Sequence, residues 1–172
     1  MAIIKFQNGN QVEIALPATV YEAAKAAELA SRDVLAAKIG DDVVALTTPL
    51  TGDTDITLLN FADKEGERVF NHTASHILAQ AVKRLYPDVK LTIGPSIDHG
   101  FYYDFDAEIA FTPDVLKKLE DEMKKIVKEN LILERSVLPR EAALERMKDE
   151  PYKQELIGEL PEDADISFYT QG

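Results

Sequence analysis

The chain has 172 residues, of which 45% are hydrophobic, and a formal net charge of −12 at pH 7. This length and composition can supply the core of one medium domain or two small ones. Without cysteine there can be no disulfide, thiolate nucleophile or cysteine zinc cluster, and with no signal peptide or membrane-length apolar run we expect a cytoplasmic protein with no membrane partner. The acidic charge argues against a nucleic-acid-binding surface spread over the whole molecule, since phosphate contacts dominate such binding.

Residues 1–61 have the pattern of a small α+β domain. Strands are expected over 2–6, 11–15, 34–39, 43–46 and 55–61, and a helix over 20–29. The Asn-Gly-Asn run at 8–10 is a strong hairpin signal, and Thr19 and Glu22 have the spacing of a capping box. Two strands, a helix and further strands is the order of a β-grasp, or ubiquitin-like, domain.

The polar segment 62–68 contains a glycine and separates two patterned regions, so it is the predicted linker. Residues 69–172 then form a second α+β domain, with helices on a mostly antiparallel sheet. Helices are expected from about 71, from 112 and over 140–148, and strands over 91–93, 100–106, 131–137 and 166–170. Thr112 and Pro113 stand in the preferred cap and first-turn positions of the helix that starts at 112. Lysines and acidic residues alternate along this helix, which indicates a solvated face, and its apolar stripe is expected to pack in the core: Val115, Leu116, Leu119, Met123, Ile126 and Val127.

His72 and His76 stand four residues apart, so they share one helix face and can converge on one substrate, water or metal ion. The apolar residues of the segment cluster on another side of the helix. Asn71 is the expected N-cap, and the positive end of the helix dipole would hold both rings neutral, the form that accepts protons or binds metal. Thr73 stands where the HExxH motif of zinc proteases has glutamate, so a peptidase is a weak interpretation.

The segment HTASHILAQAVKRLYPDVKLTIGPSIDHGFYYDFD, residues 72–106, resembles the start of the editing domain of bacterial threonyl-tRNA synthetases. Residues 1 to about 61 are similar to the small ubiquitin-like TGS domain of that family, so the resemblance covers essentially the whole chain. It implies a TGS domain at 1–61 and an editing domain at 69–172 that hydrolyses seryl-tRNA formed by mistake on threonine tRNA. A second, hydrolytic site is needed because one methyl group gives a binding pocket only about 1–3 kcal/mol of discrimination.

By this resemblance, His72, His76 and Lys153 are the expected catalytic residues, and Tyr103 is the expected substrate contact. One histidine is expected to orient or deprotonate water, and the other to contact the terminal ribose. Lys153, in the family's tyrosine-lysine pair, stabilises the oxyanion or, with a pKa lowered by burial, acts as a base. The alternatives are an exposed lysine on an acidic helix and, for Tyr103, core packing with the other aromatic residues of 101–105.

The family's editing site adds a CxxxH motif shortly after the segment ISFYTQG, and this chain has no cysteine. The chain is therefore expected to be an N-terminal fragment of a threonine–tRNA ligase, truncated before CxxxH and nearly inactive alone. It should bind no metal and no cofactor, since two histidines are too few ligands; ATP, magnesium and zinc are expected only with the missing synthetic domain. The expected partners are the aminoacylated 3′ end of tRNA and the remainder of the synthetase, with a homodimeric parent enzyme.

Three other functions remain open. The HxxxH pair could belong to a metal-dependent hydrolase, which tight zinc binding would reveal. Alanyl-type tRNA editing domains share HxxxH, but the continuation GPSIDHGFYYDFD favours the threonyl type. The third function is not enzymatic: a regulatory or RNA-binding module built on the β-grasp domain of residues 1–61.

Overall fold

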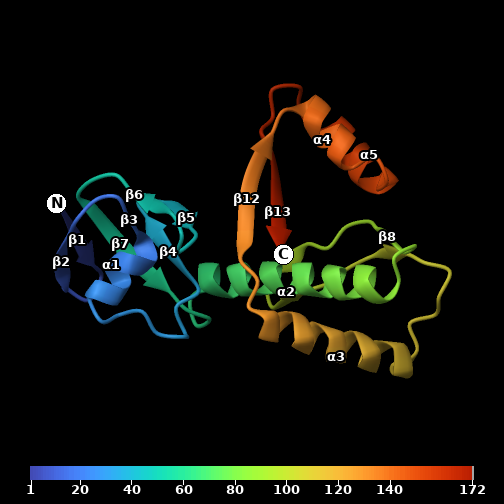
Figure 1. Ribbon diagram of the computed structural model, residues 1–172, viewed down its shortest axis with the longest axis horizontal. Helices are drawn as coiled ribbons and strands as arrows, with labels where there is room; N and C mark the ends of the chain where they lie inside the picture. Colours follow the sequence, from blue (N-terminus) through green and yellow to red (C-terminus); the bar gives the residue numbers. More distant parts are fainter. Residues whose placement is uncertain (172) are drawn as a thin grey trace. The chain divides into compact units, whose positions relative to one another are not determined.

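A computed structural model describes residues 1–171, which divide into two compact units (Figure 1). The first unit contains Met1–Thr73 and Ile97–Gly100, and the second contains Ala74–Ser96 and the chain from Phe101 onward. Helix α2 (Lys64–Leu85) is continuous and contributes residues to both units. Helices and strands occur in both, which confirms the predicted α+β class.

The first unit is a β-grasp fold, as predicted. Its elements before α2 are β1 (Ala2–Phe6), β2 (Gln11–Ile14), β3 (Ala18–Thr19), α1 (Val20–Ala26), β4 (Ala36–Ile39), β5 (Asp42–Val44), β6 (Pro49–Leu50) and β7 (Thr54–Leu59). Five strands form one sheet in the order β2-β1-β7-β4-β5. The central pair, β1 and β7, is parallel, while β1–β2, β4–β5 and β4–β7 are antiparallel.

Strand β1 shows why this sequence folds in this way. Ala2, Ile4 and Phe6 are buried while the residues between them are exposed, so one face of the strand packs into the core beneath α1. Thr19 begins α1 with the predicted capping box: its Oγ1 accepts from the Glu22 amide at 3.2 Å, and its own amide donates to Glu22 Oε2 at 2.7 Å.

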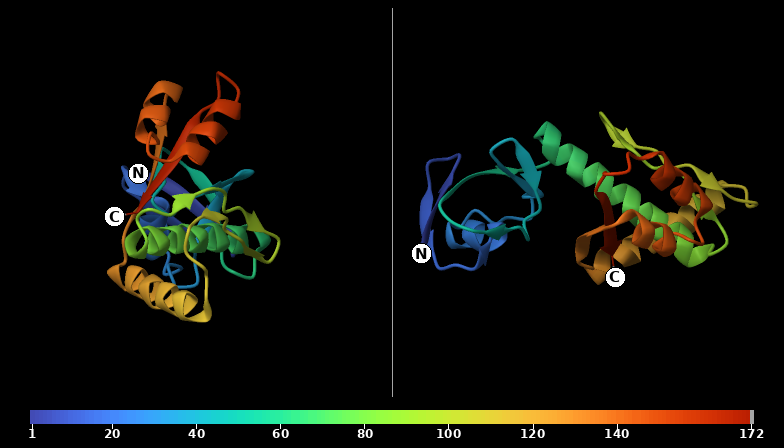
Figure 2. Two further views of the ribbon diagram at one scale, coloured as in Figure 1. Left: turned by 90° about the vertical axis from the view of Figure 1, so that its right-hand side faces the viewer. Right: turned by 90° about the horizontal axis from the view of Figure 1, so that it is seen from above.

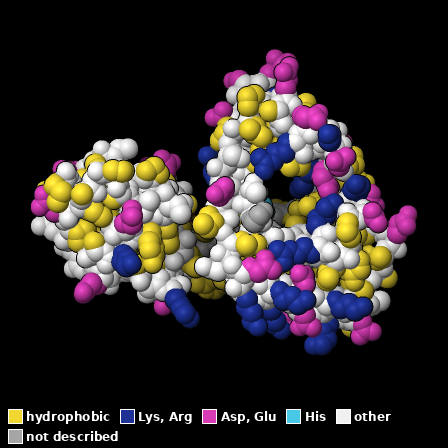
Figure 3. Space-filling view, in the orientation of Figure 1, with side chains coloured by type: hydrophobic (Ala, Val, Ile, Leu, Met, Phe, Trp, Pro, Cys, Tyr) yellow, Lys and Arg dark blue, Asp and Glu magenta, His cyan; other side chains and the backbone are white. Residues whose placement is uncertain are grey.

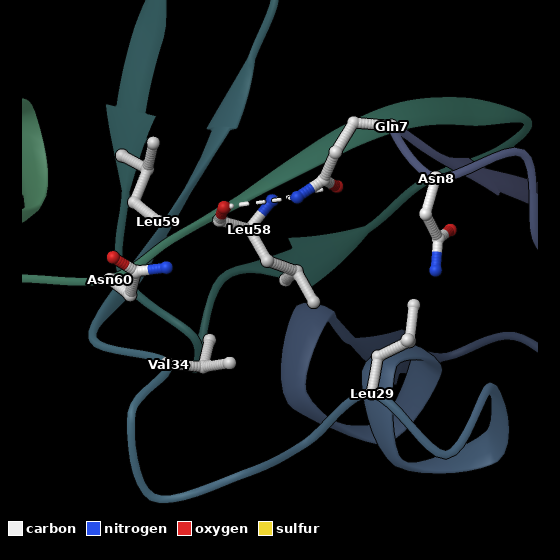
Figure 4. Close-up of a pocket in the computed structure, with 7 residues that line it drawn as sticks. All are labelled: Gln7, Asn8, Leu29, Val34, Leu58, Leu59 and Asn60. Carbon is white, nitrogen blue, oxygen red and sulfur yellow. Dashed lines mark hydrogen bonds between the residues drawn. The ribbon is translucent and has the colours of Figure 1, made fainter. Parts of the chain in front are cut away.

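Gln7 continues the β1–β7 pairing with its side chain after the β1 backbone has ended. Its Nε2 donates to Leu58 O and its Oε1 accepts from Leu58 N, both at 3.1 Å (Figure 4). The amide thus satisfies backbone groups of β7 that would otherwise lack a ladder partner. Beside it lies an open pocket of about 190 Å³, lined by Gln7, Asn8, Leu29, Val34, Leu58, Leu59 and Asn60, which include none of the predicted site residues.

The elements after α2 are shorter and pair two at a time. They are β8 (Lys90–Leu91), β9 (Ser96–Ile97), β10 (Gly100–Phe101), β11 (Phe105–Asp106), α3 (Pro113–Glu129), β12 (Leu133–Leu138), α4 (Arg140–Arg146), α5 (Pro151–Glu159) and β13 (Ile166–Gln171). β11 pairs antiparallel with β8, and β12 with β13. The antiparallel pairing agrees with the prediction, but the single strand expected over 100–106 is divided into β10 and β11.

Helices α2 and α3 lie side by side and enclose one core of the second unit (Figures 1 and 2). Thr112 caps α3 and Pro113 follows in its first turn, as predicted. Of the apolar stripe expected on α3, Leu116 and Val127 are exposed, so that part of the prediction was wrong. They lie about 60–80° around the helix from the buried Leu119, beyond the width of the contact with α2.

A second core lies at the far end of the β12–β13 ribbon, where α4 and α5 pack together (Figures 1 and 2). Its buried residues are Ala143, Ile157 and Ile166. The guanidinium of Arg140 donates to the carbonyl oxygens at the end of α5, with Nη1 2.8 Å from Ile157 O. These bonds satisfy carbonyl groups that a helix C-terminus leaves open.

Candidate functional site

Helix α2, which carries both histidines, begins at Lys64 and not at Asn71. The predicted N-cap was therefore wrong: Asn71 lies inside the helix and is buried. The sequence 62–68 looked like a linker because it is polar and contains Gly66, but most of it is the first turn of α2. Because His72 is more than two turns from the start of the helix, the helix dipole, which acts within the first turn, cannot control its charge.

Burial replaces the dipole as the cause of a neutral His72. His72 is exposed at the surface of α2, yet the partial desolvation of its ring lowers the pKa of the imidazole below the ordinary value. The neutral ring is the form that can accept a proton from water. The expected protonation state thus has a physical basis, although a different one from that inferred from the sequence.

His76 lies one turn further along α2, where it contacts the aromatic ring of Tyr169 on β13. The two ring centroids are 5.7 Å apart, with an interplanar angle of 49°. One turn later, Gln80 Nε2 donates to the Gln171 carbonyl oxygen at 3.1 Å. Residues four apart on α2 therefore meet residues two apart on β13, because both pairs share a face of their element. Together these two contacts hold the face of α2 that carries His76 against β13.

Lys153 lies on α5, where its ammonium is about half-buried. Nζ donates to the Thr92 carbonyl oxygen at 2.7 Å and lies 5.8 Å from the centroid of the Tyr103 ring. Desolvation by burial lowers the pKa of Lys153, while the Glu150 carboxylate acts in the opposite direction. The exposed-lysine interpretation is therefore wrong for this residue.

Tyr103 is packed between polar and apolar neighbours. Its ring stacks on Phe105 with centroids 4.7 Å apart and an interplanar angle of 9°, and burial raises the pKa of its hydroxyl. Gly94 lies against the ring, since a Cβ at that position would be 2.1 Å from Tyr103 Cδ2. The sequence left open whether Tyr103 is a substrate contact or a core residue; its stacking on Phe105 is the packing of a core residue, and its role as a substrate contact stays a prediction.

The structure thus forms two local groups from the predicted site residues. Lys153 meets Tyr103, whereas His76 meets Tyr169, with His72 one turn earlier on the same helix. That the two histidines and Lys153 line one cleft stays a prediction. Sequence reasoning assigned no role to Tyr169, although its position on the strand just before Gly172, next to the family's CxxxH segment, was a usable signal.

Lysines of α3 alternate with acidic residues, as expected of a solvated face (Figure 3). Lys124 pairs with Glu120 at 2.6 Å and Lys125 with Glu122 at 3.0 Å. The Lys124–Glu120 pair is exposed and contributes little to stability, whereas Glu122 is buried and also contacts Arg84.

Within residues 1–171, no three histidine, cysteine, aspartate or glutamate side chains are grouped as a metal site. In the same part of the chain, none of the helices combines the length and the apolar character needed to cross a membrane.

Comparison with known proteins gives close relatives over the full length of the chain. A threonine–tRNA ligase of Clostridium kluyveri is 51% identical over 175 residues, which cover 100% of this chain and 28% of the ligase. Ligases of the same name from Clostridium tetani and Caldanaerobacter subterraneus are 56% and 49% identical, over 82% and 99% of the chain and 22% and 27% of their own lengths. No family model matches. The chain thus spans less than a third of these relatives, and it belongs to the family of threonyl-tRNA synthetases, corresponding to the N-terminal region of the bacterial enzymes.

Proposed function

We propose that this region removes serine from threonine tRNA by hydrolysing the aminoacyl ester. The observation that carries the proposal is the His72 and His76 pair on one face of α2, in a chain that matches threonine–tRNA ligases over its full length. The parent enzyme is then a threonine–tRNA ligase, and this region corrects the errors of its synthetic site.

Ester hydrolysis needs a positioned water, a base and a stabilised oxyanion. The lowered pKa of His72 supports its assignment as the base, which takes a proton as water attacks the ester carbonyl carbon. His76, one turn further along the same helix, is proposed to orient the terminal ribose, and its ring lies against Tyr169. When the tetrahedral intermediate collapses, the carbon–oxygen bond to the ribose breaks, the protonated His72 returns its proton to the ribose oxygen, and free serine leaves.

The Lys153 ammonium is proposed to stabilise the negative charge of the tetrahedral intermediate. In a half-buried position this charge interacts more strongly with an oxyanion than it would in water. The Thr92 carbonyl and the Tyr103 ring hold the ammonium in place before substrate arrives.

The proposed substrate is the aminoacylated 3′ end of threonine tRNA, and the proposed partner is the remainder of a homodimeric synthetase. Hydrolysis in this region is assigned to protein groups and water, while ATP, magnesium and zinc belong to the synthetic domain. Addition of a chelator should therefore leave seryl-tRNA hydrolysis unchanged, whereas a metal-dependent hydrolase would lose its activity.

A chimeric enzyme tests the proposal directly. Residues 1–172 would replace the matching region of the Clostridium kluyveri ligase, and the release of labelled serine from seryl-tRNA would be measured. We expect hydrolysis of seryl-tRNA and sparing of threonyl-tRNA. His76→Ala should abolish hydrolysis, while the control His99→Ala should not, because the His99 side chain is 88% exposed and contacts Glu67.

The isolated chain should be nearly inactive if the CxxxH segment supplies the other side of the site, since orientation is worth roughly 7–11 kcal/mol in well-built sites. His76→Ala should cost the isolated chain less than about 1 kcal/mol of unfolding free energy. Full activity of residues 1–172, or a chimera that is indifferent to His76, would show that the chemistry lies elsewhere.

A further inference from the structure

Glu150 joins three elements of the second unit through one carboxylate. Oε1 accepts from Lys83 Nζ on α2 at 2.7 Å, and Oε2 accepts from the Leu91 amide on β8 at 3.2 Å. Glu150 itself immediately precedes α5, and its side chain is only 16% exposed. Charged side chains are rarely buried to this extent unless they are paired.

The position of Glu150 suggests an ordinary helix N-cap, but its contacts do not. The carboxylate makes no capping bond to the amides of α5. It contacts Lys83 and Leu91 instead, so it attaches α5 to neighbouring elements and does not cap the helix.

Lys83 is fixed as firmly as the carboxylate that it meets. Its ammonium also donates to the carbonyl oxygens of Pro87 and Val89, at 3.1 and 3.2 Å. A second bond holds the same junction, because Lys90 Nζ donates to the Asp149 carbonyl oxygen at 3.0 Å. The start of α5 is therefore attached to the end of α2 and to β8.

Lys153 is placed by this junction. Its amide donates to the Glu150 carbonyl oxygen at 3.0 Å, within the first turn of α5. From that turn its side chain reaches the Tyr103 ring and the carbonyl oxygen of Thr92, the residue that follows β8. A shift of the first turn of α5 would carry the Lys153 ammonium away from both contacts.

We propose that Glu150 is a positioning residue for Lys153: through Lys83 and Leu91 it fixes the first turn of α5 so that the Lys153 ammonium is held at Thr92 and Tyr103. The inference rests on the proposed function for its catalytic consequence, but not for its geometry. Glu150 also favours the charged form of Lys153 against the burial that lowers its pKa. Glu150 therefore holds the ammonium in place and partly opposes the effect of burial on its charge.

The test uses the whole chain and follows the Lys153 side chain by NMR. Glu150→Gln keeps the shape of the residue but removes the charge that pairs with Lys83. We expect the pKa of Lys153 to fall further below its ordinary value. We also expect the NMR signals of the methylene next to Nζ to lose the chemical-shift change that the Tyr103 ring causes. Glu145→Gln is the matched control, because Glu145 pairs with Lys148 on the exposed side of α4.

Lys83→Gln breaks the same junction from the other side and should displace Lys153 in the same way. If Lys153 keeps its titration and its contact with Tyr103 in both variants, the proposal is wrong. Unfolding of the chain by Glu150→Gln would also overturn it, since Glu150 would then be a general structural residue.

The chimeric enzyme separates this inference from the proposed function. Glu150→Gln should lower kcat for seryl-tRNA hydrolysis by up to about 100-fold, the cost of misplacing a catalytic group by 1 Å, and leave KM for the tRNA unchanged. A parent chimera without hydrolytic activity would contradict the proposed function, and the NMR result would still decide the role of Glu150. An active chimera in which Glu150→Gln changes KM alone would contradict the positioning role.

Discussion

The two units differ in how they pair their strands and bury their side chains. The first places five of its strands in one sheet, with β3 and β6 as a separate pair, and has one cluster of buried residues to which α1 contributes. The second pairs its strands two at a time and divides its core between the α2–α3 contact and the α4–α5 end. Side chains complete the backbone hydrogen bonding of strands in both units, since Gln7 does so for β7 in the first and Glu150 for β8 in the second.

Polar groups show the same contrast. Among residues 1–171, five buried side-chain polar atoms lack a hydrogen-bond partner, and four of them belong to the second unit: those of Gln80, Ser136, Arg140 and Gln171. Burial shifts the pKa values of Lys153 and Tyr103 in the second unit and lowers the pKa of His72 in the part of α2 assigned to the first unit, whereas Lys38 and Glu65 shift through their own surface pair. Buried ionisable groups with shifted pKa values are typical of functional sites. The regular first unit thus holds one of the five unpartnered polar atoms among the described residues, and the irregular second unit holds the other four together with Lys153 and Tyr103.

The largest effect should come from opening the core of the first unit. Ile4 is fully buried, so Ile4→Ala removes packing that typically contributes about 2–5 kcal/mol. Urea unfolding followed residue by residue by NMR should show β1 and β7 melting at lower urea, while α3 keeps its midpoint.

The matched variant for the second unit is Ile126→Ala, at a site that is 1% exposed. It should lower the midpoint of α3 and leave β1 unchanged. If each substitution lowers both midpoints equally, the units unfold as one, and the domain boundary predicted over 62–68 has no thermodynamic meaning.

Two glycines give a smaller effect that compares the units directly. A Cβ on Gly66 would lie 1.9 Å from the backbone oxygen of Asn60, and one on Gly94 would lie 2.1 Å from the ring of Tyr103. An added methyl group in a packed site lowers the unfolding free energy by about 1–3 kcal/mol. Gly66→Ala should fall at the upper end because a backbone carbonyl cannot move alone, and Gly94→Ala at the lower end because a ring can rotate.

Gly158→Ala is the control, because a Cβ there meets nothing within 4 Å and alanine favours a helix over glycine. It should raise the unfolding free energy by up to about 1 kcal/mol. Gly94→Ala should also separate the Tyr103 ring from Lys153, which NMR can detect. An unchanged Lys153 environment in Gly94→Ala would mean that the ring does not position the ammonium.

The regular unit could be predicted from sequence because its signals are local. Turn chemistry at 8–10, the capping box of Thr19 and the alternation in β1 each determine structure within a few residues. The predicted bounds of its strands therefore differ from the structure by only a few residues.

The start of α2 could not be predicted in the same way, because tertiary contact decides it. Gly66 suggested a break, yet it is required where the helix passes close to Asn60. The buried face of α2 includes the polar residues Asn71 and Ser75, which a search for apolar periodicity passes over. Likewise, the contacts of Glu150 with Lys83, 67 residues away in sequence, leave no local pattern.

The smallest predicted effect concerns the pH dependence of stability at His72. Burial lowers the pKa of His72, so the unfolded chain binds its proton more readily than the folded one. The contribution of His72 to stability is therefore complete above about pH 6.5, the ordinary value, and is lost as the pH falls through the lowered pKa. Replacing His72 with glutamine should remove this loss.

Urea unfolding of the parent chain and of His72→Gln at pH 8 and pH 5 measures how the unfolding free energy of each depends on pH. Subtracting one from the other removes the contribution of the carboxylates, which both proteins share. The His72 contribution should appear in the transition of the first unit, to which the contacts of residues up to Thr73 assign it. His99→Gln, at an exposed position in the same unit, is the control. If the contribution appears in the transition of the second unit instead, the charge of His72 is coupled through α2 to the stability of that unit. The helix that carries both histidines would then unfold with the second unit and not with the first.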